Sequence, residues 1–243
     1  AFIFFRFLQM LLIFTSAGIY YKKLGISPFL NLLGLSILAW GMSNSLYDSE
    51  LSFNTFFDIA FFLIAGILIL YQKFAPIIPL TILAALNRET SALIPLLLAM
   101  YAIFGLREAD RRKRPLIFAG IALVIFIIIF TVLRVHYGEQ PLRTAGGSSL
   151  GLEMLFFNIF RWVTWGQIFL TLGIIPILAV LSYRYSPRSL QIFFWTIVPA
   201  WLVVHSLAAN LSETRLLLVP QALIFIPAAC LGAQYIVMLD SNK

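Results

Sequence analysis

Seven stretches of this sequence are apolar over the roughly 20 residues that an α-helix needs to cross the hydrocarbon core of a bilayer. They are residues 1–20, 29–46, 54–72, 115–136, 165–183, 191–208 and 215–237. Of the 243 residues, 61% are hydrophobic and 11% are charged, whereas about 25% of the residues of a soluble domain are charged. The sequence therefore predicts an all-α fold, a polytopic bundle of transmembrane helices that forms one transmembrane domain over residues 1–243.

The basic residues gather in five clusters between or after the apolar stretches. The clusters are Lys22 with Lys23, Lys73, Arg107 to Arg114, Arg184 with Arg188, and Lys243. Loops rich in Lys and Arg stay in the cytoplasm, so we place these clusters there and interpret 107–114 as a cytoplasmic basic loop. The net charge of +7 then indicates contact with anionic membrane lipids, and no nucleic acid partner is expected.

The stretch 75–106 is long for one span and short for two, and Asn87 to Thr90 interrupt its apolar character. As one span it would put Lys73 and the 107–114 cluster on opposite sides of the membrane. As two short helices it places both clusters in the cytoplasm, which then holds 11 basic and 3 acidic residues. We therefore predict about seven full spans plus a short helical hairpin over 75–106, with its apex facing outward.

This topology brings four segments to the non-cytoplasmic side of the membrane. They are 43–55, 87–91, 137–163 and 208–215. The longest of them ends in apolar residues at helical spacing followed by Trp162 and Trp165. Because an amphipathic helix with aromatic residues at its end is typical of the membrane surface, we predict an outer loop at 137–163 that contains one interfacial helix.

Two outer segments carry Glu-Thr and an arginine just before an apolar helix: Arg88-Glu89-Thr90 and Glu213-Thr214-Arg215. A helix N-terminus offers unpaired N–H groups, and arginine offers a fork of donors that suits phosphate. Alternatively, the glutamates stabilise their own helix N-termini and the arginines pair with them or with phospholipid. We favour substrate binding for Asn87, Arg88 and Glu89, since charges within a membrane are costly; for Glu213 and Arg215 both interpretations stay open.

Three carboxylates and a histidine complete the candidate site. Asp58 shares one helix face with Asn54, which places it about one turn into the membrane. A buried carboxylate usually has a partner, and the candidates are Arg88, Arg134 and Arg6. Asp48 and Glu50 would suit a divalent cation or a general base, or are solvated loop residues. His136 is interpreted either as a headgroup ligand or general acid–base, or as an interfacial residue beside Tyr137.

Other classes of site are not indicated by the sequence. The single cysteine, Cys230, excludes an intrachain disulfide and a cysteine-based metal site. The sequence contains no Walker loop, dinucleotide fingerprint, HExxH zinc motif or GxSxG elbow. Apart from a divalent cation at Asp48 and Glu50, no metal or other cofactor is therefore predicted.

The pattern of these outer residues resembles the GT-C-type polytopic membrane glycosyltransferases, the bacterial mannosyl- and arabinosyltransferase-like proteins. The resemblance rests on Tyr47 to Glu50, Phe53 to Asp58, Leu86 to Thr90, Glu213 to Arg215, and Pro220. It implies a polyprenyl-phosphate-linked sugar donor, a glycan or lipid acceptor, a site on the non-cytoplasmic face of the bacterial inner membrane, and no nucleotide cofactor.

In that family the catalytic acid usually lies in the first large outer loop, after the first span. Ala1 is not Met and already lies in an apolar run, so we expect the chain to be the C-terminal portion of a longer protein. The catalytic residue is therefore unknown, and a chain without that loop would be inactive. Two alternatives remain: an O-antigen polymerase or ligase, and a transporter or flippase of a lipid-linked or anionic substrate with 75–106 as its discontinuous helix.

Overall fold

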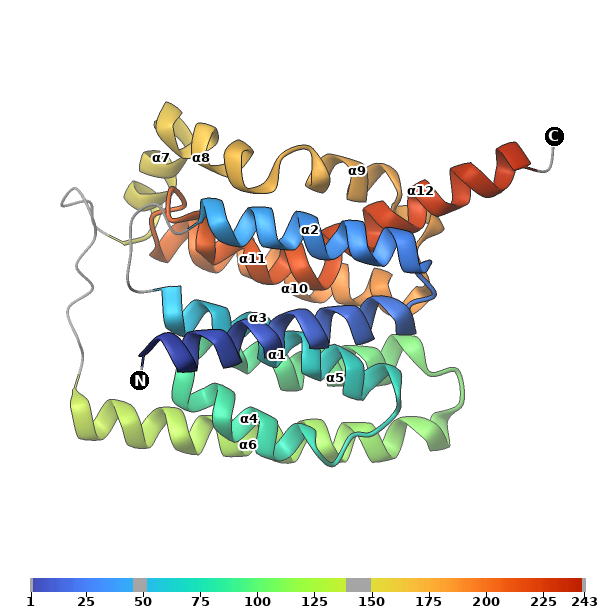
Figure 1. Ribbon diagram of the computed structural model, residues 1–243. Coiled ribbons are helices and arrows are strands. Elements are labelled where there is room, and N and C mark those ends of the chain that lie inside the picture. The colour runs from blue at the N-terminus through green and yellow to red at the C-terminus, as the bar shows by residue number, and fades with distance from the viewer. Residues whose placement is uncertain (1, 46–51, 139–149, 242–243) are drawn as a thin grey trace.

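The computed structural model describes residues 2–45, 52–138 and 150–241, and every regular element in these ranges is a helix (Figure 1). Five helices among them are long and apolar enough to cross a membrane. They are α1 (Phe2–Lys23), α3 (Ser52–Leu70), α6 (Ala109–Tyr137), α10 (Arg188–Ala208) and the helical stretch from Thr214 to Asp240. The prediction of an all-α bundle of apolar helices is confirmed.

The predicted count of about seven full spans is not confirmed, because two of the predicted spans take other forms. Helix α2 (Pro28–Asn44) has 17 residues, which corresponds to about 25 Å. The predicted span 165–183 divides into α8 (Trp162–Leu172) and α9 (Ile175–Leu181), which meet at 71°. Gly173 ends α8 with a φ of +58°, and Pro176 stands in the first turn of α9. Hydropathy does not detect such a bend, because it is caused by backbone conformation.

The stretch 75–106 forms two short helices, α4 (Ile77–Asn87) and α5 (Leu93–Gly105), joined by the 3-10 helix η1 (Glu89–Ala92). They run in opposite directions and both pack on α6 (Figure 1). The break occurs at Arg88, whose extended backbone (φ −157°, ψ 154°) ends α4. The apex therefore lies at the end of the bundle where α3 begins and α6 finishes.

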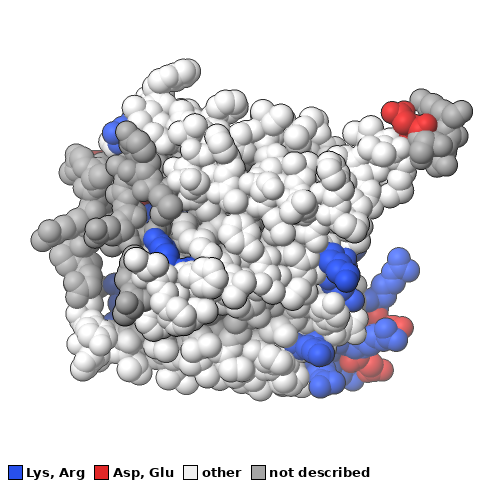
Figure 2. All heavy atoms as spheres, in the orientation of Figure 1, with Lys and Arg blue, Asp and Glu red and all other residues white. Residues whose placement is uncertain are grey.

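Basic side chains gather at the other end of the bundle. Figure 2 shows Lys and Arg side chains at the end where α1 finishes and α6 begins. In this region Arg112 donates from Nε to the carbonyl oxygen of Leu106 at 2.7 Å, and Lys23 lies over the ring of Tyr71. The hairpin apex and the basic clusters thus occupy opposite ends, as the two-helix interpretation of 75–106 requires.

The C-terminal stretch forms the centre of the bundle and contains a π-helix. It consists of the 3-10 helix η3 (Thr214–Leu217), α11 (Leu218–Pro220), the π-helix Gln221–Phe225 and α12 (Ile226–Ser241). A π-turn disturbs the regular main-chain hydrogen bonds of a helix. The hydroxyl groups of Tyr20 and Tyr21 donate to the carbonyl oxygens of Leu223 and Ala222, each at 3.0 Å. Helix α1 thereby supports the irregular part of the buried helix.

Helix α12 approaches the end of α9 closely at Gly232. A Cβ atom at this position would overlap Oγ and Cβ of Ser182. We expect Gly232→Ala to lower the free energy of unfolding by about 1–3 kcal/mol, because the two helices must move apart. Thermal unfolding in detergent, followed by circular dichroism, measures this change.

A matched control for that variant is Gly120→Ala on α6, where an added Cβ meets nothing within 4 Å. We expect no loss of stability there, since alanine favours a helix over glycine. Combining Gly232→Ala with Ser182→Gly should restore most of the lost stability. Equal losses from Gly232→Ala and Gly120→Ala would contradict the steric explanation.

Candidate functional site

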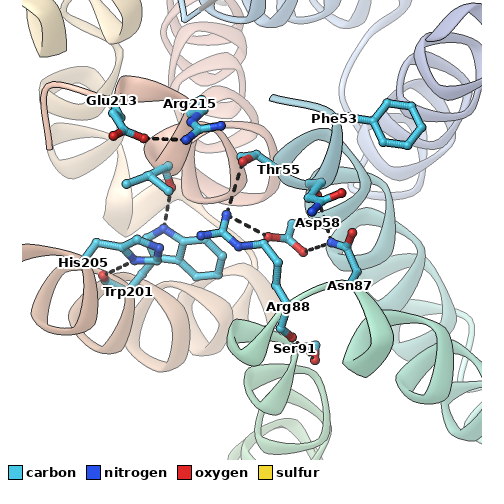
Figure 3. Close-up of polar contacts among 12 residues, drawn as sticks. Phe53, Thr55, Asp58, Asn87, Arg88, Ser91, Trp201, His205, Glu213 and Arg215 are labelled. Atoms are coloured by element: carbon cyan, nitrogen blue, oxygen red, sulfur yellow. Dashed lines mark hydrogen bonds and ion pairs between the residues drawn. The ribbon is translucent and has the colours of Figure 1, made fainter. Parts of the chain in front are cut away.

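The hairpin apex and the first turns of α3 form a buried polar cluster around Asp58 (Figure 3). The Asp58 side chain is 1% exposed, and its Oδ2 atom lies 3.3 Å from Nη1 of Arg88. Asn87 donates from Nδ2 to Oδ1 of Asp58 at 2.6 Å and to the carbonyl oxygen of Asn54 at 2.8 Å. Of the three predicted partners of Asp58, the structure therefore selects Arg88.

The local backbone fixes Arg88 in this position. Its N–H group donates to the carbonyl oxygen of Ala84, which completes α4. Its own carbonyl oxygen accepts from Oγ of Ser91 at 2.6 Å and from the Ser91 N–H group at 3.2 Å. The Arg88 guanidinium also donates from Nη1 to Oγ1 of Thr55 at 3.3 Å. The polar break in the apolar sequence is thus a turn with a defined structure.

A second ion pair joins the apex to α6. Arg134 donates from Nη2 to Oε1 of Glu89 at 2.7 Å, and its guanidinium lies over the ring of Phe130. These side chains are 41% and 67% exposed, so solvent or a bound ligand can reach both. The third predicted partner of Asp58, Arg6, instead donates to Gln9 and lies over the ring of Phe56.

A cavity of about 560 Å³ lies between the hairpin apex and the end of α6. Its polar lining comes from Asn87, Arg88, Glu89, Arg134 and Tyr137. Leu86 and Phe130 are among its apolar lining residues. The cavity therefore combines two arginine residues with an apolar wall, which suits an anionic group attached to a hydrophobic chain.

The segment Glu213-Thr214-Arg215 lies at the same end but does not line this cavity. Arg215 is mostly buried and pairs with Glu213 through Nη2. Its Nε atom is buried and has no hydrogen-bond partner among the described residues. Thr214 shares a 2.6 Å hydrogen bond with Thr171 of α8. As at the hairpin apex, this segment forms a 3-10 turn before a helix, so the two similar sequences share a local structure.

Trp201 and His205 of α10 lie next to this segment (Figure 3). The indole N–H group of Trp201 donates to the carbonyl oxygen of Leu216 at 2.6 Å. The His205 ring stacks on Trp201 with 4.8 Å between the ring centroids, and its Nδ1 lies 2.9 Å from the Trp201 carbonyl oxygen. The buried aromatic pair therefore holds the Glu213-Thr214-Arg215 turn in place.

Other predicted site residues are not brought into the cavity. His136 packs edge to face against Tyr137, with 4.7 Å between ring centroids, at the exposed end of α6, and it does not line the cavity. Asp48 and Glu50 lie outside the described residues. Within the residues described, no group of three or more His, Cys, Asp or Glu side chains gathers at one place.

Sequence reasoning missed three members of this site: Thr55, Arg134 as the partner of Glu89, and Tyr137 as part of the cavity lining. Thr55 had a usable signal, because it lies three residues before Asp58 and hence on the same helix face. Arg134 and Tyr137 are remote from the apex in sequence. Their role depends on how α6 packs against the hairpin.

No protein-family model, curated protein sequence or solved structure matches the chain. The resemblance to GT-C glycosyltransferases stays a prediction. The polar residues of the cavity are two arginines, a glutamate, an asparagine and a tyrosine.

Proposed function

We propose that the cavity at the hairpin apex binds the phosphate of a polyprenyl-phosphate-linked sugar. The chain would then be part of a membrane glycosyltransferase that acts on the non-cytoplasmic face of the bacterial inner membrane. The observation that carries the proposal is the presence of Arg88 and Arg134 in one cavity with an apolar wall. Arginine forms bidentate hydrogen bonds to phosphate, and the apolar wall suits a hydrophobic chain.

Both arginines retain donors for a ligand. In the described part of the chain, the Arg88 contacts with Asp58 and Thr55 use Nη1 alone, which leaves Nε and Nη2. The Arg134–Glu89 pair is substantially exposed, and such pairs contribute about 0–1 kcal/mol. A phosphate can therefore displace Glu89 from Arg134 at small cost. The ion pair between Arg88 and Asp58 is expected to stay intact when this happens.

The remaining polar groups suit a sugar or an acceptor. Both Nδ2 hydrogens of Asn87 are used by Asp58 and by the Asn54 carbonyl. Asn87 lines the cavity, and its Oδ1 atom would be the acceptor for a hydroxyl group. When a phosphate binds Arg134 in place of Glu89, the Glu89 carboxylate becomes a second acceptor for hydroxyl groups. No described residue is assigned as the catalytic acid or base.

The proposed sidedness follows the charge distribution, with the basic end in the cytoplasm. Helix α7 (Leu152–Phe160) would then be the interfacial helix at the outer surface. Its Leu152, Phe156 and Phe160 side chains are exposed, as expected of a face that contacts lipid. On the opposite face, Asn158 is buried and bonds to the main chain of Ser206, Ala209 and Leu211.

The proposal predicts that the whole protein, purified in detergent, binds a polyprenyl monophosphate. Arg134→Ala should weaken this binding by about tenfold to a hundredfold, because charge-assisted hydrogen bonds to the phosphate are lost. Arg88→Ala should abolish sugar transfer from the polyprenyl-phosphate donor. Titration followed by native mass spectrometry gives the affinity, and a radiolabelled donor reports transfer.

Arg161→Ala is the matched control, because Arg161 is at the same end of the bundle, stacks on Phe157 and does not line the cavity. We expect its affinity and transfer to match those of the unmodified protein. Arg88→Lys keeps the positive charge beside Asp58 and so tests the guanidinium without removing the ion pair. Unchanged affinity in Arg134→Ala and unchanged transfer in both Arg88 variants would reject the proposal.

A transporter of an anionic substrate is the second candidate. The observation that favours it is the interrupted segment α4–η1–α5, with Arg88 and Glu89 at its break. Transporters bind substrates at such discontinuous helices. Substrate uptake into proteoliposomes without a transfer product would favour the transporter over the glycosyltransferase.

A further inference from the structure

A second cavity lies at the opposite end of the bundle from the hairpin apex. It has a volume of about 250 Å³ and is lined by residues from the end of α5 and the start of α10. Its lining includes Phe104 of α5, Tyr183 of the 3-10 helix η2 (Tyr183–Tyr185), and Arg188, Gln191 and Trp195 of α10. None of these residues takes part in the site proposed above.

Arg188 is the cation of this cavity. It is exposed and is the first residue of α10, where the helix dipole adds a partial positive charge. The described residues supply it with no hydrogen bond, ion pair or aromatic ring. The neighbouring Arg184, by contrast, lies over the ring of Tyr185 at 4.7 Å. Arg188 therefore has its full set of donors available to an anion.

A hydroxyl donor lies in the same cavity. The indole N–H group of Trp195 donates to the Tyr183 hydroxyl oxygen at 2.8 Å. The Tyr183 O–H hydrogen is thus directed away from Trp195 and can be donated to another acceptor. Gln191 donates from Nε2 to the carbonyl oxygens of Ser186 and Tyr183, at 3.1 and 3.4 Å. These contacts hold the 3-10 turn against α10 and fix the position of Tyr183.

Most of the remaining cavity wall is apolar, and two of its aromatic side chains are exposed. Trp195 is 64% exposed and Phe104 is 52% exposed. Tryptophan and tyrosine are enriched where a membrane meets water, and the basic clusters place this end at the membrane surface. A small soluble anion would gain nothing from the exposed aromatic rings, whereas a lipid would bury them.

We propose that this cavity binds the headgroup of an anionic phospholipid from the cytoplasmic leaflet. The phosphate lies between the Arg188 guanidinium and the Tyr183 hydroxyl group. One acyl chain lies along Phe104 and Trp195. Free phosphate has the same chemistry as the headgroup but lacks the chain. Lipid binding here bridges α5 and α10.

The experiment uses the whole protein, delipidated in detergent and titrated with short-chain phosphatidylglycerol under native mass spectrometry. We expect Arg188→Ala to weaken binding about tenfold, through loss of a charge-assisted contact. Arg184→Ala removes the same charge four residues away, outside the cavity, and is expected to leave the affinity within about twofold. Arg188→Gln gives a second neutral variant, and the unfolding temperature without lipid shows that each variant folds.

Different ligands distinguish a lipid headgroup from free phosphate as the source of the bound phosphate group. Phosphatidylglycerol should bind more tightly than phosphatidylcholine of the same chain length, and inorganic phosphate should not compete at millimolar concentration. If Arg184→Ala and Arg188→Ala weakened phosphatidylglycerol binding equally, binding would depend on the general positive charge of this surface and not on the cavity. That result would overturn the proposal. Competition by inorganic phosphate, or equal binding of phosphatidylcholine, would also overturn it.

Discussion

Asp58→Ala is expected to lower the free energy of unfolding by about 3–5 kcal/mol, because it removes one partner of a buried ion pair. The Asp58 side chain is 1% exposed, and its loss leaves Arg88 without its carboxylate and Asn87 without one of its two acceptors. Reversible unfolding in mixed micelles measures the change.

Glu89→Ala is the matched control, since it also removes the carboxylate partner of an arginine at the hairpin apex. The Glu89–Arg134 pair is exposed, so the expected loss is below about 1 kcal/mol. The double variant Asp58→Leu with Arg88→Leu should lose less stability than the two single variants together, because no uncompensated charge remains. Similar losses from Asp58→Ala and Glu89→Ala would show that burial of the first pair has little energetic importance.

Trp201→Ala is expected to have the other large effect, a loss of about 3–5 kcal/mol of unfolding free energy. Trp201 is fully buried, packs edge to face against Phe62 and stacks on His205. Its removal leaves a void and also leaves the Leu216 carbonyl oxygen without its donor. Thermal unfolding of the purified protein provides the measurement.

Two further variants divide this effect into its parts. Trp201→Phe keeps an aromatic ring but removes the N–H donor and part of the ring volume, so the expected loss is about 1–3 kcal/mol. Trp162→Ala, at a side chain that is 86% exposed, should change the stability by less than about 1 kcal/mol. A Trp201→Ala variant as stable as Trp162→Ala would mean that the core around α10 relaxes to fill the space.

The sequence predicted the parts of this fold that depend on local composition. The length of the apolar stretches predicted the helices. The positions of Lys73 and the 107–114 cluster correctly indicated two short helices in 75–106. A buried carboxylate needs a partner, and this reasoning included Arg88 among the candidates for Asp58. In these cases the prediction depends on the cost of placing a charge in an apolar environment. That cost can be judged from the position of each charged residue in the sequence.

The remaining features depend on backbone conformation and on contacts between distant segments. The bend at Gly173 divides an apolar stretch that hydropathy treats as continuous. The Glu89–Arg134 pair joins residues 45 positions apart, and its formation requires the packing of α6 against the hairpin. The cavity leaves no periodic signal in the sequence, whereas Trp201 and His205 do lie at the i, i+4 spacing of one helix face.

The π-helix near the centre of the bundle determines which way the last helix faces. A π-turn holds about one residue more than an α-turn, and one residue corresponds to about 100° of rotation about a helix axis. If Gln221–Phe225 were a regular α-helix, the later residues of α12 would be turned by about this angle. Gly232 would then point away from Ser182, and a larger side chain would occupy the narrow contact. Two tyrosine hydroxyl groups on α1 therefore help to set the rotational phase of α12 against α9.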